Sequence, residues 1–260
     1  MLRLPALALL LSLTVLAGCA TQTVRDNEPR TEFDASQAEK RAATRVELAA
    51  GYFARGQHTI ALDELKQALA LQPNSRDALN LRALVLAAMG DTAAAEESFR
   101  RLLSIYPGDG DTWHNQAWFF CQQGRVDAAM QSFETALRQP NYRGVARSWL
   151  ARGACEMRHQ RWTDAQQSLT RAFELDPANP AAAFNLAETL LRLGQAERAK
   201  FYAARVNAVT EQVTAQSLWL ATRIEHRLGN RPGVQEFGQR LAREFPQSQE
   251  ALAFGAGRFE

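Results

Sequence analysis

The chain opens with an apolar stretch that stands apart from everything after it. Residues 4–16 are almost wholly apolar, follow the basic residue Arg3, and give way to small residues. This is the layout of a secretory signal. Its thirteen residues fall short of the roughly 20 that a helix needs to cross a bilayer. We therefore expect residues 1–18 to be a removable signal peptide and not a lasting transmembrane anchor.

The next segment, residues 19–41, is polar and charged, without apolar periodicity. A segment of this composition cannot bury enough apolar surface to fold by itself. The sequence predicts a flexible tether here.

From residue 42 onward, apolar residues recur at the spacing of amphipathic helices, and the whole pattern repeats every 34 residues. Ala61, Ala95 and Ala129 are 34 apart, as are Gly56, Gly90 and Gly124, while Leu65, Phe99 and Phe133 follow the alanines by four. Two residues, 144 and 145, interrupt the register, and a further slip falls at Thr214. The predicted units are 42–75, 76–109, 110–143, 146–179, 180–213 and 215–248, with 249–260 as a C-terminal cap.

These recurring positions resemble the tetratricopeptide repeat, in which each 34 residues form two antiparallel helices. The resemblance implies an all-α fold, a right-handed superhelical solenoid of about six repeats. Small residues let helices approach closely, large apolar residues fill the gaps between repeats, and proline ends the second helix because it lacks a donor.

At the end of the apolar stretch, Leu16, Ala17, Gly18 and Cys19 resemble the lipobox of bacterial lipoproteins. The resemblance implies cleavage before Cys19 and attachment of acyl and diacylglycerol groups to it, with no other cofactor. Because Ala20, not aspartate, follows the cysteine, it also implies lipid anchoring in the outer membrane, facing the periplasm.

Charge and motifs narrow the function further. The 30 basic and 28 acidic residues are dispersed, which leaves no basic patch for nucleic acid. The four histidines are isolated, and there is no HExxH, CxxC, GxSxG or phosphate-binding glycine loop, so we expect neither a metal site nor an enzyme.

Cys121 and Cys155 fall on neighbouring first helices, in a compartment that permits disulfides. Their positions within the repeat differ by two, which sets their side chains about 160° apart in helical phase. We expect two buried free thiols, with a bridge as the open alternative.

In tetratricopeptide arrays the first helices line a concave groove. Carrying this geometry onto the chain predicts a partner-binding surface that is apolar at its N-terminal end and more basic at its C-terminal end, suited to a protein segment with a hydrophobic anchor and an acidic stretch. Its candidate residues are Phe53, Leu84, His114, Trp118, Gln122, Arg158, Phe184, Arg192, Trp219 and Arg223. For Phe53 and Leu84, packing between repeats is an equally good interpretation.

The layout of lipobox, tether and six repeats, with TWHNQAWFFCQQGRVDAAMQSFETALRQPNYRGVARSWLARGACEM at 112–157, is similar to the type IV pilus biogenesis lipoproteins of the PilF/PilW type. Trp118, Phe119 and Phe120 stand where members often carry Gly, Gly and Phe. The resemblance implies a monomeric pilotin that binds the type IV pilus secretin and promotes its outer-membrane localisation and multimerisation. A periplasmic scaffold for peptidoglycan hydrolases, or an outer-membrane protein assembly factor, remains the alternative, since repeat arrays bind many proteins.

Overall fold

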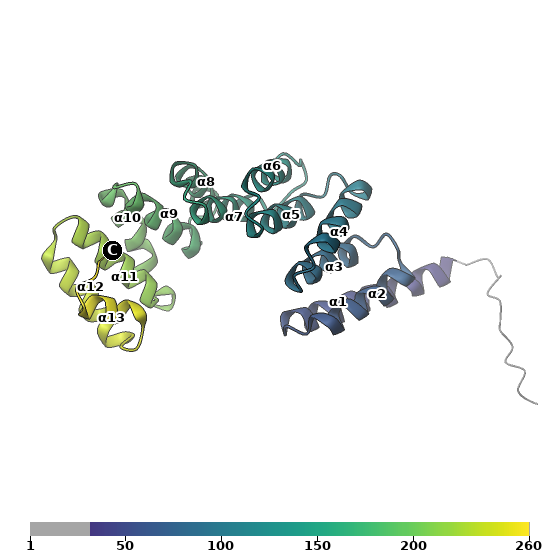
Figure 1. Cartoon of the computed structure of the whole chain (residues 1–260), viewed down its shortest axis with the longest axis horizontal. Coiled ribbons are helices and arrows are strands. Elements are labelled where there is room, and N and C mark those ends of the chain that lie inside the picture. Colours follow the sequence, from purple (N-terminus) through teal and green to yellow (C-terminus); the bar gives the residue numbers. More distant parts are fainter. Residues whose placement is uncertain (1–31, 260) are drawn as a thin grey trace, which may run out of the picture.

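The computed structural model describes residues 32–259 as a succession of paired helices (Figure 1). The signal peptide 1–18, Cys19 and the tether as far as residue 31 lie outside the described residues. The helices are α1 (Glu32–Ala54), α2 (His58–Leu71), α3 (Arg76–Ala88), α4 (Thr92–Ile105), α5 (Gly110–Gln122), α6 (Val126–Leu137), α7 (Val145–Arg158), α8 (Trp162–Leu175), α9 (Pro180–Arg192), α10 (Ala196–Asn207), the 3₁₀ helix η1 (Thr210–Gln212), α11 (Ala215–Arg227), α12 (Arg231–Glu244) and α13 (Gln249–Gly255).

Local signals set where these helices begin. The side chains of Ser75, Asp91, Asn179, Thr214 and Asn230 each accept a hydrogen bond from a backbone N–H of the first turn that follows. Such caps satisfy donors that have no partner inside the helix. The prediction of an all-α repeat solenoid is confirmed, because the regular elements of residues 32–259 are all helices.

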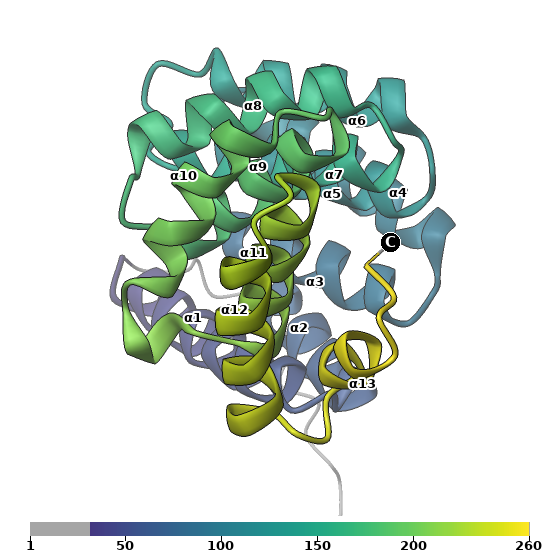
Figure 2. The same ribbon diagram turned by 90° about the vertical axis from the view of Figure 1, so that its left-hand side faces the viewer.

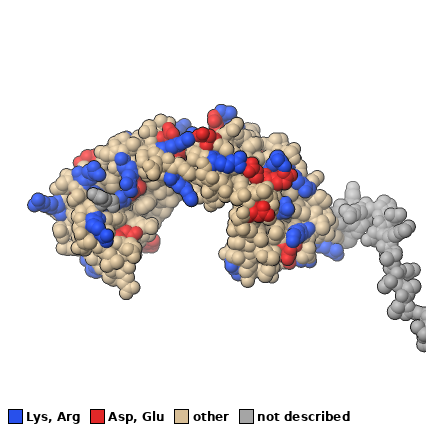
Figure 3. Space-filling model, in the orientation of Figure 1, with Lys and Arg blue, Asp and Glu red and all other residues tan. Residues whose placement is uncertain are grey.

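The helix pairs stack into an arch (Figure 1). The first helices α3, α5, α7, α9 and α11 contact one another in succession and form the inner row, while α4, α6, α8 and α10 lie on the outer side. Fully buried side chains fill the space between the rows, among them Leu65, Phe99, Phe133, Leu169 and Leu186. The surface is hollowed on the inner side of the arch, and basic and acidic residues intermingle on the face shown (Figure 3).

The first helix begins at Glu32, ten residues before the predicted start of the repeats, so residues 32–41 are not part of a flexible tether. This segment holds three alanines, Glu39 and Lys40, all of which favour helix. Ala42 is fully buried, which shows that the helix is already packed against the array at this point. Tertiary packing downstream stabilises a turn that sequence periodicity alone does not reveal.

Between the third and fourth pairs, the interruption in register is filled by Tyr142. The connection spans residues 138–144, whereas residues 106–109 connect the second and third pairs. The Tyr142 ring is buried, and a Cβ atom added at Gly110 or Gly144 would lie 2.6 Å or 2.5 Å from its atoms. Glycine at both positions leaves the space that the ring occupies.

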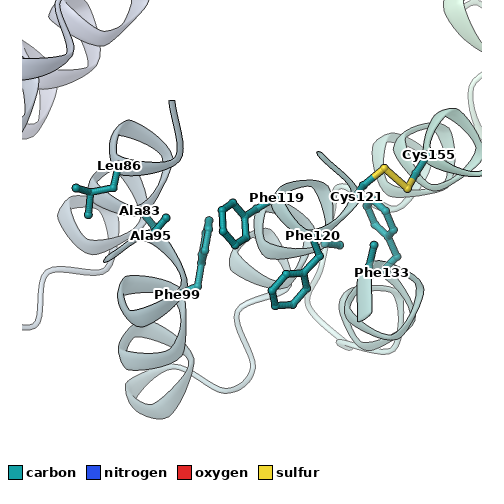
Figure 4. Packing of buried hydrophobic residues seen from close by; sticks show 11 residues of the cluster. Ala83, Leu86, Ala95, Phe99, Phe119, Phe120, Cys121, Phe133 and Cys155 are labelled. Atoms are coloured by element: carbon teal, nitrogen blue, oxygen red, sulfur yellow. A yellow bond between two sulfur atoms is a disulfide. The ribbon is translucent and has the colours of Figure 1, made fainter. Parts of the chain in front are cut away.

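Cys121 and Cys155 form a disulfide that joins α5 to α7, with a Cα–Cα distance of 5.9 Å (Figure 4). The expectation of two free thiols is wrong. Neighbouring parallel helices related by translation face each other through opposite sides, so a phase difference near 160° turns two side chains toward each other. The phase difference was correct, and its consequence was the reverse of the one expected.

The chain after the sixth pair forms α13, capped by Ser248. Phe254 on this helix packs against α12, where a Cβ atom at Gly238 would lie 2.1 Å from its ring. Among residues 32–259, no helix combines the length and the apolar character needed to span a bilayer.

Candidate functional site

The inner row of helices carries the residues predicted to line a groove, but it exposes them unequally. Gln122, Arg158 and Arg192 are exposed, Phe53, Leu84, Trp118, Phe184, Trp219 and Arg223 are partly buried, and His114 is buried. Phe53, Leu84 and Trp118 pack against the apolar clusters of the first repeats. Phe184 packs against the cluster of the later repeats. The apolar candidates therefore contribute to the core as well as to the inner surface.

His114 lies in the interior, where it is 8% exposed. Its Nδ1 is 2.8 Å from the Ser148 hydroxyl, and that hydroxyl is also 2.6 Å from the Tyr142 hydroxyl. Burial lowers the pKa of His114 to about 4, and the nearby charge of Arg147 lowers it further. The side chain thus links the third and fourth repeats as a neutral imidazole and does not line an open groove.

At the C-terminal end of the arch, three predicted residues, Arg192, Trp219 and Arg223, line one groove of about 1180 Å³. Leu191, Gly194, His226, Arg227, Ala253, Gly257, Arg258 and Phe259 complete its walls. Trp219, Arg223 and His226 lie on one side of α11 because residues at i, i+4 and i+7 share a helix face. The groove therefore combines an aromatic wall with a basic rim.

A single carboxylate balances part of this positive charge. Glu188 on α9 pairs with Arg223 of the next repeat and, at 3.2 Å, with Arg192 on its own helix. Arg227 and Arg258 add two further positive charges to the rim. The Nε of Arg223 is buried and has no hydrogen-bond partner within residues 32–259.

Sequence reasoning missed two contributors to this groove in its list of candidates. His226 could have been found, since it follows Trp219 by seven residues on the same helix face. Phe259 could not, because it lies beyond α13 and no periodic pattern indicates where such a tail folds.

Cys121, Cys155 and His159 form a cluster whose ligand atoms lie within 4.8 Å of one another. Two sulfurs and an imidazole are suitable ligands for a soft metal. The metal-binding form of cysteine is the thiolate, however, and both sulfurs are joined in the disulfide. In this form the cluster is a crosslink, with the Nε2 of His159 3.3 Å from the Cys121 carbonyl oxygen.

Comparison with known families assigns most of the described chain. Two models, each described as a tetratricopeptide repeat, match residues 46–110 and residues 86–151 and 156–218. Together they span the first helix through the start of α11.

Individual relatives match nearly the whole length. The type IV pilus assembly protein PilF of Pseudomonas aeruginosa is 26% identical over 241 residues, which covers 93% of this chain and 94% of that protein. The crystal structure of PilW, described as a widely conserved type IV pilus biogenesis factor, is 28% identical with a TM-score of 0.72, covering 82% of this chain and 97% of PilW. The structure of Pseudomonas aeruginosa PilF has the same TM-score at 23% identity, covering 85% of this chain and 99% of that one, and shows the shared fold.

Proposed function

The chain belongs to the tetratricopeptide repeat family, and on that premise we propose that it is a pilotin: a lipid-anchored adaptor that brings the type IV pilus secretin to the outer membrane and promotes its assembly into multimers. Tetratricopeptide scaffolds bind protein segments and generally have no catalytic activity of their own. Homology to type IV pilus biogenesis factors supports a role in pilus assembly.

The observation that carries the proposal is the match to PilF along almost the full length of both chains. A repeat fold alone would support any protein partner, since repeat arrays serve many functions. A relative that matches from end to end shares the lengths of the repeats and the place of their interruption, and these set the shape of the inner surface.

The lipobox supports the location of this adaptor. Acylation of Cys19 would hold the arch at the periplasmic face of the outer membrane, as Ala20 after the cysteine suggests. Since α1 begins at Glu32, residues 20–31 can separate the anchor from the fold by at most about 40 Å when fully extended. A secretin subunit bound to the arch would be kept within that range of the membrane, which raises its local concentration there.

The deciding experiment compares secretin multimers in the parent strain and in a strain lacking this gene. We expect heat-resistant multimers to disappear on deletion and to return with the gene supplied in trans. Undiminished multimers in the deletion strain would contradict the proposal and favour a scaffold for other envelope proteins.

Anchoring is tested separately with Cys19→Ala. Without the thiol that accepts the lipid, the variant should fold normally but leave the outer-membrane fraction, and secretin multimers should fall. Cys121→Ala is the control for loss of a thiol, because it leaves the lipobox intact. A Cys19→Ala variant that stays in outer-membrane fractions and supports normal multimers would rule out the anchoring mechanism.

Capture by the inner surface is tested with Trp118→Ala. If Trp118 anchors the client, its truncation should weaken secretin binding by about 2 kcal/mol. Trp149→Ala is a matched control, since Trp149 packs beneath the Arg152 guanidinium on a wall shared with α8. Equal secretin affinity of both variants in a pull-down titration would remove Trp118 from the binding surface.

A further inference from the structure

An aromatic side chain of the chain itself already occupies the C-terminal groove. The Phe259 ring lies parallel to the His226 imidazole, with centroids 4.2 Å apart and an interplanar angle of 9°. It also stacks on Trp219 at 5.7 Å and 23°, and it meets Phe254 edge-on at 6.4 Å. The inner face of α11 thus holds a slot into which a phenyl ring fits.

The backbone after α13 directs Phe259 to this slot. Gly257 adopts φ +64°, which L side chains rarely adopt, and the Arg258 N–H donates a hydrogen bond to the Ala253 carbonyl oxygen at 3.0 Å. The turn sends the chain back from α13 toward α11 (Figure 2). Residues 257–259 are held by this turn and by the ring stack.

The rim of the slot is basic beyond what its own acidic group balances. Arg192, Arg223, Arg227 and Arg258 line the groove. Glu188 pairs with Arg192 and Arg223, and the guanidinium groups of Arg227 and Arg258 have no ion pair within residues 32–259. Guanidinium groups bind carboxylates in a bidentate geometry, so the rim is suited to an acidic segment.

We propose that this slot binds an aromatic residue flanked by acidic residues in a protein partner, and that Phe259 is an internal occupant which the partner must displace. The proposal rests on the proposed function, in which the inner surface captures a client segment, and it identifies the end of the groove and the chemistry of the segment. The fit of a phenyl ring is visible in the stack itself, and the surplus of arginine specifies the flanking charge.

The internal occupant has a measurable consequence. When a site is free for only a fraction of the time, the apparent dissociation constant exceeds the intrinsic one by the inverse of that fraction. A ring held by two stacking contacts at the end of a short tail is a competitor of this kind. Removing it should strengthen partner binding, whereas removing the slot should weaken it.

The test uses the full-length chain in detergent and a fluorescein-labelled peptide, Gly-Asp-Glu-Phe-Asp-Glu-Gly, as the probe in fluorescence anisotropy titrations. Phe259→Ala should bind this peptide five- to tenfold more tightly than the parent chain. Phe259→Tyr should restore the parent affinity, because tyrosine keeps the ring. Trp219→Ala should bind at least tenfold more weakly than the parent.

Two controls separate the slot from general effects. Phe201→Ala removes a phenyl ring that is 55% exposed on α10 and lies outside the groove, and it should leave peptide affinity unchanged. Peptides with alanine in place of phenylalanine, or with asparagine and glutamine in place of the acids, should bind Phe259→Ala at least tenfold more weakly. A thermal melt shows whether each variant folds.

Equal affinity of the parent chain and Phe259→Ala for the acidic peptide would overturn the proposal. So would equal binding of the peptide without a ring, or a preference for a lysine-flanked phenylalanine. These outcomes are independent of the secretin assay: multimers lost on gene deletion together with an unchanged peptide affinity would reject the slot and keep the pilotin. Tight peptide binding with undisturbed multimers would do the opposite.

Discussion

The fourth repeat meets its two neighbours in different ways. Toward the fifth repeat, the packing is regular and apolar, built around Leu169, Leu186 and Leu190 with Ala165 and Ala187 as the small partners. Toward the third repeat, at the interruption in register, the chain uses a disulfide together with hydrogen bonds among Tyr142, Ser148 and His114.

This difference shows what an insertion does to a solenoid. Uniform spacing lets each repeat present the same apolar positions to the next, so stability is a sum of similar interfaces. Two extra residues shift those positions, and specific polar and covalent links then fix the geometry. Buried polar groups stabilise such a junction only when they are paired, which the Tyr142–Ser148–His114 chain achieves.

The largest expected effect comes from removing the crosslink. Replacing both Cys121 and Cys155 with alanine should lower the free energy of unfolding by about 4 kcal/mol, because a bond between residues 34 apart in sequence restrains the unfolded chain. Urea unfolding of the oxidised parent and the variant measures the loss. Dithiothreitol should reduce the stability of the parent by a similar amount, and an unchanged midpoint under reducing conditions would contradict the prediction.

The regular junction should be weakened by a cavity and not by reduction. Leu186→Ala removes a fully buried side chain and should cost about 3 kcal/mol. The cost should be the same with and without dithiothreitol, since no crosslink spans this interface. Leu252→Ala is the matched control, because Leu252 is 55% exposed on α13 and its truncation should change stability by less than about 0.5 kcal/mol.

The irregular junction should be sensitive to acid. The pKa of His114 is lowered to about 4 in the folded chain, so the unfolded chain binds the extra proton as pH falls below the ordinary histidine range. Stability is therefore full above about pH 6.5 and declines toward pH 4, with a loss of about 2 kcal/mol between pH 7.5 and pH 5.

His114→Gln should remove this part of the pH dependence in urea titrations at the two pH values. His58→Gln, on α2 and distant from the junction in sequence, should retain it. A parent chain and a His114→Gln variant with identical pH profiles would show that the imidazole does not titrate as described.

The smallest effect concerns the turn between α7 and α8. Glycine adopts a positive φ in the turns at Gly56, Gly90, Gly124, Gly194 and Gly229, but in the fourth repeat Gln160 adopts φ +59°. A left-handed conformation costs a residue with a Cβ atom about 1 kcal/mol, so Gln160→Gly should stabilise the chain by up to that amount. Gly124→Gln should do the reverse, and a destabilised Gln160→Gly variant would show that the glutamine side chain contributes more than its backbone costs.

The repeat architecture could be predicted because it depends on spacing. Gly56, Gly90 and Gly124 mark turns that require positive φ, and the 34-residue period between them fixes the helix pairs. The start of α1 at Glu32 could not be predicted, since residues 32–41 lack apolar periodicity and gain their helix from packing that begins at Ala42.

The candidate site was predictable only where helical phase decides exposure. Trp219 and Arg223 follow the phase of a first helix and line the C-terminal groove. His114 has the same phase, yet the insertion places Ser148 and Tyr142 against it, and such packing depends on three-dimensional contacts. The position of Phe259 depends on a turn at Gly257 that has no periodic counterpart.

The crosslink between α5 and α7 also has a mechanical meaning. A solenoid bends as a row of hinges in series, one at each junction between repeats, because each repeat touches only its neighbours. The bond between Cys121 and Cys155 locks the hinge at the middle of the row. Opening or closing of the arch must then be taken up by the junctions on either side, and a pull on one arm is transmitted to the other without slippage between the third and fourth repeats.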